Sequence, residues 1–286
     1  MNPSQRILVT GATGFVGRHV VQELLVHGYE VYAVSRDQKK AESMPWWEKV
    51  RYTVADIHHP DMDLITICGV PDVLIHLAWP GLPHYDSLSH FEDTLPADYR
   101  FIKRMVLAGV KQVLITGTCF EYGLQNGCLS KDMPTVPVTP YGLAKDTLRK
   151  SLEMLRKVHP FTLQWVRLFY LYGPGQNPKS LLSQLDAAID RGDPVFRMSG
   201  GEQIRDYLPV EEVARRIVQI AGHPDCHGII NCCSGRPVSI RRLVEEHITR
   251  RGARIELELG YYPYPEYEPM AFWGDESLTQ SIFQYD

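Results

Sequence analysis

Residues 6–17 of the chain read RILVTGATGFVG, a run of strand-forming residues that passes directly into regularly spaced glycines. Gly11, Gly14 and Gly17 form a G-x-x-G-x-x-G pattern, and a helix is expected to follow over Val16–His27. Glycine is needed where a chain turns tightly and where its backbone must approach a pyrophosphate. The helix N-terminus would present free N–H groups and a positive dipole to those phosphates. We therefore interpret this stretch as the phosphate-binding loop of a dinucleotide site.

Strands alternate with helical segments along the first half of the chain. Gly28 ends the first helix, and a helix rich in basic and apolar residues is expected over Tyr99–Ala108. After the first strand, further strands are expected at Glu30–Ser35, Val50–Val54, Val73–Leu77 and Val113–Thr116. This alternation predicts an α/β fold, Rossmann-like, in which a doubly wound parallel sheet is covered by helices on both faces.

The second half of the chain is less regular, because prolines divide it into loops between helices. Helices are expected at Tyr141–Val158, Pro178–Arg191, Val210–Ala221 and Ile240–Arg250. The tyrosine- and proline-rich stretch Tyr261–Pro269 is interpreted as an irregular surface segment. We expect residues 1–166 to form mainly a dinucleotide-binding domain. Residues 167–286 are expected to form mainly a smaller substrate-binding region, interleaved with the first by exchanged segments.

Composition excludes several classes of protein. The 286 residues include 30 basic and 34 acidic side chains, and this net charge of −4 gives no reason to expect nucleic acid or an anionic membrane as partner. No apolar run reaches the length of a membrane-spanning helix, and the N-terminal residues lack the apolar run of a signal peptide. We therefore expect a cytoplasmic protein.

The six cysteines are too few for a disulfide scaffold and include no Cys-x-x-Cys pair. We interpret them as small buried hydrophobic residues in a reducing compartment. His58, His59 and His76 are interpreted as structural, and since no cluster has the spacing of metal ligands, no metal site is expected.

The end of the second strand bears on the choice of dinucleotide. An acidic residue there accepts hydrogen bonds from the ribose hydroxyls, whereas a nearby arginine favours a 2′-phosphate. The hydroxyl of Ser35 and the guanidinium of Arg36 suit a phosphate, so NADP(H) is favoured. Asp37 is the counter-argument, because it could supply the acid one or two places late and select NAD(H).

A candidate catalytic pair lies on the helix expected from Tyr141. Residues four apart share one face of a helix, so the Tyr141 phenol and the Lys145 ammonium point into the same space. The ammonium lowers the pKa of the phenol and holds the cofactor ribose. The phenol then exchanges a proton with a sugar oxygen as hydride moves.

Together with the glycine loop and the Tyr141/Lys145 pair, further motifs resemble those of one family over nearly the whole chain. The chain resembles the extended short-chain dehydrogenase/reductase family, in particular its nucleotide-sugar epimerases, dehydratases and ketoreductases. The motifs that carry this resemblance are Val54–Ile57, Leu74–Ala78, Val113–Gly123, Arg167–Gly175 and Gly200–Tyr207.

The resemblance implies roles for individual residues. It implies a catalytic triad of Thr118, Tyr141 and Lys145, with Thr118 hydrogen-bonding the oxygen at the reacting carbon. It implies a homodimer that pairs helices including Tyr141–Val158, and a nucleotide-sugar substrate. The residues implied to bind the dinucleotide are Gly11, Thr13, Gly14, Phe15, Val16, Gly17, Ser35, Arg36, Asp56, Ile57, Leu77, Ala78, Tyr141 and Lys145. The residues implied to bind the substrate are Trp79, Thr118, Cys119, Phe120, Tyr170 and Arg205, the last by pairing with the diphosphate.

Departures from the family pattern narrow the reaction. Sugar 4,6-dehydratases of this family place an acid pair directly after the threonine, where this chain has Cys119 and Phe120, so dehydration is not expected. Tyr170 replaces an asparagine that normally helps hold the substrate phosphates. Trp79 replaces a small residue, where it would either narrow the pocket over the nicotinamide or serve packing.

Three functions follow from these patterns. The favoured one is reduction of an NDP-4-keto-6-deoxyhexose at C4, with Tyr141 protonating the new alkoxide. The first alternative is an NDP-sugar 4-epimerase with the same triad and a retained NAD. The second, less favoured because the triad is intact, is a non-catalytic dinucleotide-binding regulator.

Overall fold

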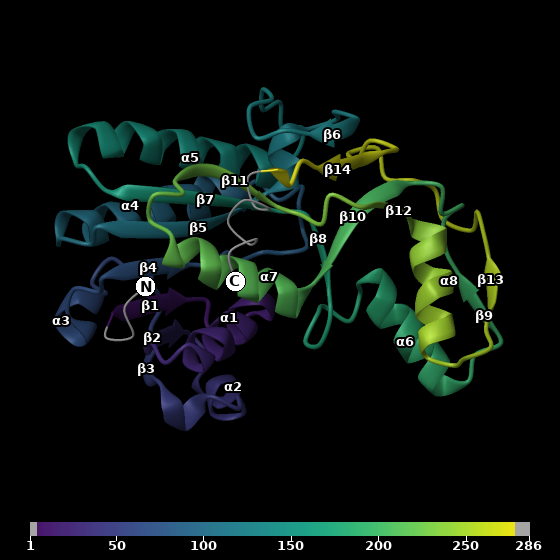
Figure 1. Ribbon diagram of the computed structural model, residues 1–286, viewed down its shortest axis with the longest axis horizontal. Coiled ribbons are helices and arrows are strands. Elements are labelled where there is room, and N and C mark those ends of the chain that lie inside the picture. The colour runs from purple at the N-terminus through teal and green to yellow at the C-terminus, as the bar shows by residue number, and fades with distance from the viewer. Residues whose placement is uncertain (1–4, 278–286) are drawn as a thin grey trace.

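The computed structural model describes residues 5–277 and is built around a seven-stranded sheet (Figure 1). All neighbouring strands of this sheet are parallel, and their order is β11-β7-β5-β4-β1-β2-β3. The strands are β1 (Arg6–Thr10), β2 (Glu30–Ser35), β3 (Arg51–Val54), β4 (Val73–His76), β5 (Gln112–Thr118), β7 (Thr162–Leu168) and β11 (Gly228–Cys232). The predicted Rossmann-like α/β fold is confirmed.

Helices cover both faces of the sheet because its strands are apolar on both sides. In β1, Ile7 and Val9 pack into one core with α1 and α7, whereas Leu8 packs into the other with α3, α4 and α5. Figure 1 shows α1 and α7 on one side of the sheet and α5 on the other. These helices are α1 (Phe15–Val26), α3 (Leu64–Cys68), α4 (Leu95–Leu107), α5 (Pro140–Val158) and α7 (Val210–Gly222).

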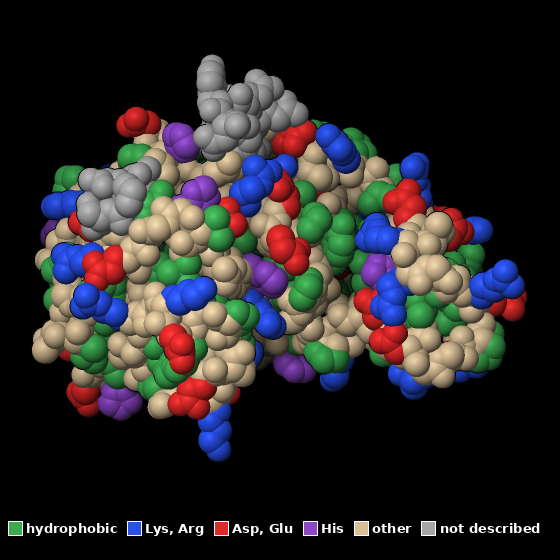
Figure 2. All heavy atoms as spheres, turned by 60° about the horizontal axis from the view of Figure 1, so that its bottom comes forward, with side chains coloured by type: hydrophobic (Ala, Val, Ile, Leu, Met, Phe, Trp, Pro, Cys, Tyr) green, Lys and Arg blue, Asp and Glu red, His purple; other side chains and the backbone are tan. Residues whose placement is uncertain are grey.

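A smaller lobe has a core of its own, formed by apolar residues such as Leu185, Phe196 and Val244. It lies at one end of the molecule in Figure 1, and Figure 2 shows a notch between it and the main body. The lobe contains α6 (Leu181–Arg191), α8 (Ile240–Arg250) and the parallel pair β9 (Val195–Arg197) and β13 (Glu256–Glu258).

The remaining elements are short. A three-stranded sheet has the order β12-β10-β8, and β14 pairs with β6. These strands are β6 (Gly127–Leu129), β8 (Tyr170–Tyr172), β10 (Ile204–Pro209), β12 (Pro237–Ser239) and β14 (Phe272–Gly274). The short helices are α2 (Gln38–Glu42) and the single turns η1 (Trp47–Lys49), η2 (His90–Thr94) and η3 (Cys119–Tyr122).

Several boundaries differ from the predictions. Helix α4 begins at Leu95 rather than Tyr99, because Pro96 fits the first turn of a helix, where no N–H bond is lost. Helix α6 begins at Leu181 rather than Pro178. Strands β7 and β11 were not predicted, although both complete the main sheet.

The cysteines only partly fit their interpretation as buried residues. All six are unpaired, and four are buried, but Cys128 is exposed and Cys226 is half-buried. In the part of the chain that the structure describes, no helix is both long and apolar enough to cross a bilayer.

Candidate active site

A cavity of about 800 Å³ opens at the carboxyl edge of the main sheet, where β1, β2, β4 and β5 end. This edge, at the point where the strand order reverses between β1 and β4, is where open α/β sheets bind ligands. Every residue that the sequence assigned to the dinucleotide, the substrate or catalysis lines this cavity, with the exception of Arg205.

The glycine loop packs so closely that side chains are excluded from it. Gly11 has φ +69°, and a Cβ there would lie 2.8 Å from the backbone nitrogen of Ala78, in the segment that follows β4. A Cβ on Gly17 would overlap the carbonyl oxygen of Gly11. Bare backbone therefore faces the cavity at the start of α1, as a bound pyrophosphate requires, so these residues fit a dinucleotide.

The polar groups at the end of β2 are partly engaged within the protein. The Ser35 and Tyr52 hydroxyls are hydrogen-bonded at 2.8 Å. The Asp37 carboxylate accepts a 3.0 Å bond from the backbone N–H of Lys40 and caps α2. Arg36 and Lys40 both line the cavity, so two cations and one carboxylate border the place expected for the adenosine ribose.

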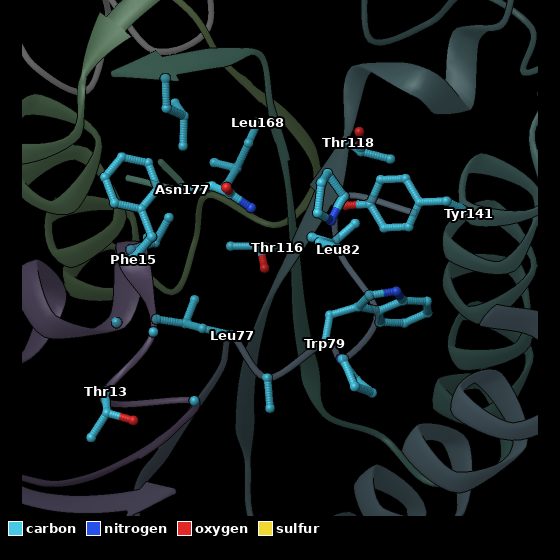
Figure 3. Close-up of a pocket in the computed structure, with 18 of the residues that line it drawn as sticks. Thr13, Phe15, Leu77, Trp79, Leu82, Thr116, Thr118, Tyr141, Leu168 and Asn177 are labelled. Atoms are coloured by element: carbon cyan, nitrogen blue, oxygen red, sulfur yellow. The ribbon is translucent and has the colours of Figure 1, made fainter. Parts of the chain in front are cut away.

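The three residues predicted to be catalytic, Thr118, Tyr141 and Lys145, all line the cavity. Tyr141 and Lys145 lie on the buried face of α5, and Figure 3 shows the Tyr141 hydroxyl pointing into the cavity near Thr118. Burial raises the pKa of the Tyr141 phenol, and its hydrogen bond with Thr118 opposes this. Burial lowers the pKa of Lys145 to about 8, although Asp98 and Glu121 favour its charged form. The Lys145 ammonium donates a 2.8 Å hydrogen bond to the carbonyl of Thr116.

Thr118 is held at the end of β5 by a capping box. Its hydroxyl accepts a 3.2 Å bond from the backbone N–H of Phe120, and its own N–H donates to Glu121 at 2.9 Å. The fully buried Glu121 carboxylate also accepts bonds from Trp165 at 2.9 Å and from Arg167 at 2.7 Å. Through Glu121, the backbone of Thr118 at the end of β5 is thus linked to the neighbouring strand β7.

Trp79 lies beside the catalytic pair. Its ring centroid is 3.8 Å from the Lys145 ammonium nitrogen, and its ring meets that of Tyr141 edge-on at 5.9 Å. The indole N–H donates a 3.1 Å hydrogen bond to Nδ1 of His90, a residue that the sequence analysis did not select. Trp79 therefore contacts Lys145 as well as lining the cavity.

Arg205, predicted to bind the substrate diphosphate, does not line the cavity. Its side chain is fully buried away from the cavity lining and forms a 2.7 Å ion pair with Glu268. The same carboxylate accepts a 2.6 Å bond from Tyr170, which does line the cavity. Asp206, the next residue in the sequence, accepts hydrogen bonds from the backbone N–H groups of Ser234 and Gly235.

Further residues of the site were missed because they lie on irregular segments. Tyr85 lines the cavity, and its ring centroid lies 4.9 Å from that of Phe120. The Tyr267 ring centroid lies 6.1 Å from that of Phe120, although Tyr267 does not itself line the cavity. Tyr267 belongs to the stretch that was interpreted as irregular surface, and no local signal marked it. Glu121 could have been found, because Thr-x-x-Glu is the spacing of a capping box.

Two of the histidines interpreted as structural belong to a buried polar network. Asp98 lies 2.6 Å from Nε2 of His58 and 3.4 Å from Nε2 of His76. Thr10, the last residue of β1, bonds Nδ1 of His76 at 2.8 Å. Within residues 5–277, no group of three or more His, Cys, Asp and Glu side chains could hold a metal ion.

The Rossmann-like fold and its close-packed glycine loop are those of a dinucleotide-dependent enzyme. The chain belongs to the NAD dependent epimerase/dehydratase family, whose sequence profile matches residues 7–233. It is therefore an enzyme of the short-chain dehydrogenase/reductase type, and the resemblance seen in the sequence is confirmed.

Individual relatives act on nucleotide sugars according to their names. The chain is 32% identical over 272 residues to dTDP-6-deoxy-L-talose 4-dehydrogenase (NAD(+)) of Aggregatibacter actinomycetemcomitans, covering 94% of this chain and 98% of that protein. It is 28% identical over 280 residues to UDP-glucose 4-epimerase of Mycolicibacterium smegmatis, covering 92% of this chain and 86% of the relative.

Solved structures give the same fold. MoeE5 in complex with UDP-glucuronic acid and NAD superposes with a TM-score of 0.83 at 28% identity, covering 98% of this chain and 92% of that one. UDP-glucuronic acid 4-epimerase from Bacillus cereus, with 23% identity, a TM-score of 0.84 and coverage of 98% and 93%, shares the fold. The names that mention a cofactor specify NAD, so these relatives do not support the predicted preference for NADP(H).

Proposed function

We propose that this enzyme reduces the C4 keto group of an NDP-4-keto-6-deoxyhexose. The observation that carries the proposal is that Tyr141, Thr118 and Lys145 line one cavity in which the two residues after Thr118 are Cys119 and Phe120 rather than acids. A 4-dehydrogenase of a dTDP-6-deoxy sugar, similar over nearly its whole length, supports both the position of reaction and the sugar class.

The chain's own residues supply the proton chemistry. When bound, the reduced dinucleotide supplies hydride to the C4 carbon. Tyr141 gives its proton to the alkoxide oxygen that forms there, and Thr118 donates a hydrogen bond to the same oxygen. Lys145 lies one helical turn from Tyr141 on the buried face of α5. Its positive charge would favour the phenolate that Tyr141 leaves behind, whereas burial disfavours that phenolate.

The side chains beside Tyr141 disfavour dehydration. The Phe120 ring lies 6.2 Å from the Tyr141 ring and has no group that could remove or supply a proton. Burial raises the pKa of the Cys119 thiol well above its ordinary value, with Glu268 adding to the effect, so Cys119 remains neutral. The rings of Tyr85 and Phe120, which both line the cavity, are also a suitable surface for the methyl group of a 6-deoxy sugar.

For the cofactor, we propose NADP(H). Arg36 and Lys40 both border the cavity beyond β2, and guanidinium and ammonium groups bind a 2′-phosphate well. The Asp37 carboxylate, by contrast, already accepts a hydrogen bond from the backbone N–H of Lys40 and so caps α2. The names of the relatives favour NAD instead, so direct titration of both cofactors is required.

A 4-epimerase with a retained NAD is the second candidate, because several relatives carry that name and would use the same triad. Mass spectrometry of the dinucleotide carried through purification separates the two. A reductase is expected to lose its cofactor or bind it reversibly, whereas stoichiometric bound NAD would favour the epimerase. The regulator hypothesis is set aside, since the family is one of enzymes.

Two organisational proposals accompany the function. We propose a homodimer formed through α4 and α5, because Leu107 on α4 and Leu143 and Met154 on α5 expose large apolar side chains. We also propose that residues 1–166 mainly bind the dinucleotide and residues 167–286 mainly bind the sugar nucleotide. In support of exchanged segments, β7, β11 and α7 pack into the main body.

The direct test is an assay of the reduction of a dTDP- or UDP-4-keto-6-deoxyhexose. The reaction is monitored through the oxidation of NADPH, and the product is identified by NMR. Tyr141→Phe is the matched control, since it removes only the proton donor. We expect turnover to fall by about 10²–10⁴-fold while dinucleotide affinity stays nearly unchanged. Failure of the parent enzyme to consume the 4-keto sugar, or a variant within about threefold of the parent, would refute this function.

A further inference from the structure

Trp79 lies on the segment that follows β4, and its ring faces a residue of another element, Lys145 on α5. We propose that Trp79 is a positioning residue that keeps the Lys145 ammonium charged and aimed at the dinucleotide site through its indole face. We further propose that His90 holds the indole in place for this purpose.

The ammonium group has few partners for a buried charge. Lys145 is 2% exposed, and one of its three N–H bonds goes to the carbonyl of Thr116 at 2.8 Å. The Trp79 ring centroid lies 3.8 Å from Nζ, within the range in which a ring face attracts a cation. The carbonyl and the ring together leave the remaining N–H for a ligand in the cavity, which both residues line.

Among residues 5–277, no acidic side chain forms a direct ion pair with Lys145. The charged groups that act on it from neighbouring elements are Asp98 on α4 and Glu121 on η3, and both favour the ammonium. Each of them is engaged elsewhere, Asp98 with His58 and Glu121 with Arg167. Burial outweighs them and lowers the pKa of Lys145 to about 8, so an added attraction from the indole face matters near neutral pH.

His90 fixes the orientation of the indole. Nδ1 of His90 accepts the indole N–H at 3.1 Å, and Nε2 donates to the carbonyl of His84 at 2.8 Å. His90 is fully buried, so its side chain has no freedom to swing away, and its ring also lies 5.3 Å from that of Tyr141. Because the Trp79 indole is already held in place, its contact with the Lys145 ammonium costs less conformational entropy than the same contact from a freely rotating side chain.

The test measures dinucleotide binding rather than turnover, so it does not depend on the identity of the sugar. The dissociation constant of NADH is measured by fluorescence from about pH 7 to about pH 10, above the range in which histidines titrate. NADH is used because it lacks the 2′-phosphate. The proteins are the parent, Trp79→Leu, Trp79→Phe, Lys145→Met and the double variant Trp79→Leu/Lys145→Met. Trp273→Phe, on β14 and outside the cavity lining, controls for loss of a tryptophan.

In the parent, affinity is expected to fall as the pH rises through about 8, and Lys145→Met is expected to abolish this fall. Trp79→Leu should move the fall downward by about one pH unit, and Trp79→Phe, which retains a weaker ring face, by roughly half as much. In the Lys145→Met background, Trp79→Leu should have no pH-dependent effect.

Equal midpoints for the parent and Trp79→Leu would overturn the proposal, as would a fall in affinity that persists in Lys145→Met. A uniform loss of affinity in Trp79→Leu without a shift of the midpoint would mean that the ring only packs against the cofactor. Either result leaves the proposed sugar reductase untouched, and failure of the sugar assay likewise leaves this binding test intact.

Discussion

Replacement of Glu121 by glutamine probes the buried charge that ties the catalytic threonine to the sheet. Glu121 is fully buried and pairs with Arg167, whose side chain is equally buried and whose two terminal nitrogens have no hydrogen-bond partner among residues 5–277. Burial alone would lower the pKa of Arg167, but Glu121 reverses this and raises it, so the guanidinium stays charged. Glutamine would leave that charge in the interior without a counter-ion.

The expected cost follows from this geometry. Removing one partner of a buried ion pair destabilises a protein by about 3–5 kcal/mol, mainly through the uncompensated charge that is left. For a chain of 286 residues, this corresponds to a fall in Tm of roughly 5–8 °C. The matched control is Glu153→Gln, whose carboxylate is 33% exposed and pairs with Arg149, and which should cost less than about 1 kcal/mol.

The assay is urea unfolding followed by tryptophan fluorescence, with thermal unfolding as a second measurement. Glutamine retains an oxygen that could accept the Thr118 N–H, so dinucleotide binding should survive at temperatures well below Tm. If Glu121→Gln unfolds within about 1 kcal/mol of the parent, the buried pair does not stabilise this site and the reasoning is refuted.

Other perturbations test separate parts of the site. Gly17→Ala places a Cβ against the carbonyl of Gly11, so we expect dinucleotide affinity to fall at least about tenfold, and unchanged affinity in a titration would contradict the close-packed loop. Burial opposes the ionised form of Asp98, but His76 and His58 outweigh it and lower its pKa to about 2. Its stabilising contribution of about 2 kcal/mol is therefore complete above about pH 4 and is lost as the pH falls toward 2. The difference in unfolding free energy between the parent and Asp98→Asn should shrink over that interval, and a constant difference would refute the assignment. Arg36→Ala should weaken NADPH binding by about tenfold and NADH binding much less, whereas equal losses, or a parent that prefers NADH, would assign the ribose to Asp37.

Local sequence patterns determined much of this protein. The glycine loop, the first strands and the helical pairing of Tyr141 with Lys145 were all readable, because each depends on residues within a few positions of one another. Backbone conformation and helical periodicity act at that range, so the dinucleotide site and its edge of the sheet could be predicted. The sequence also shows directly that Cys119 and Phe120 stand where the sugar 4,6-dehydratases have an acid pair.

Only the tertiary structure decided which distant side chains meet. Arg205 pairs with Glu268, 63 residues away, rather than with the adjacent Asp206 or the cavity. The Trp79 ring contacts the Lys145 ammonium on another element. The indole N–H bonds to His90, which lies on a turn that no sequence pattern marked. These contacts depend on how helices and loops pack over the sheet. A buried charge or N–H must find a partner in that packed interior, and the chain's local pattern does not specify which one lies within reach.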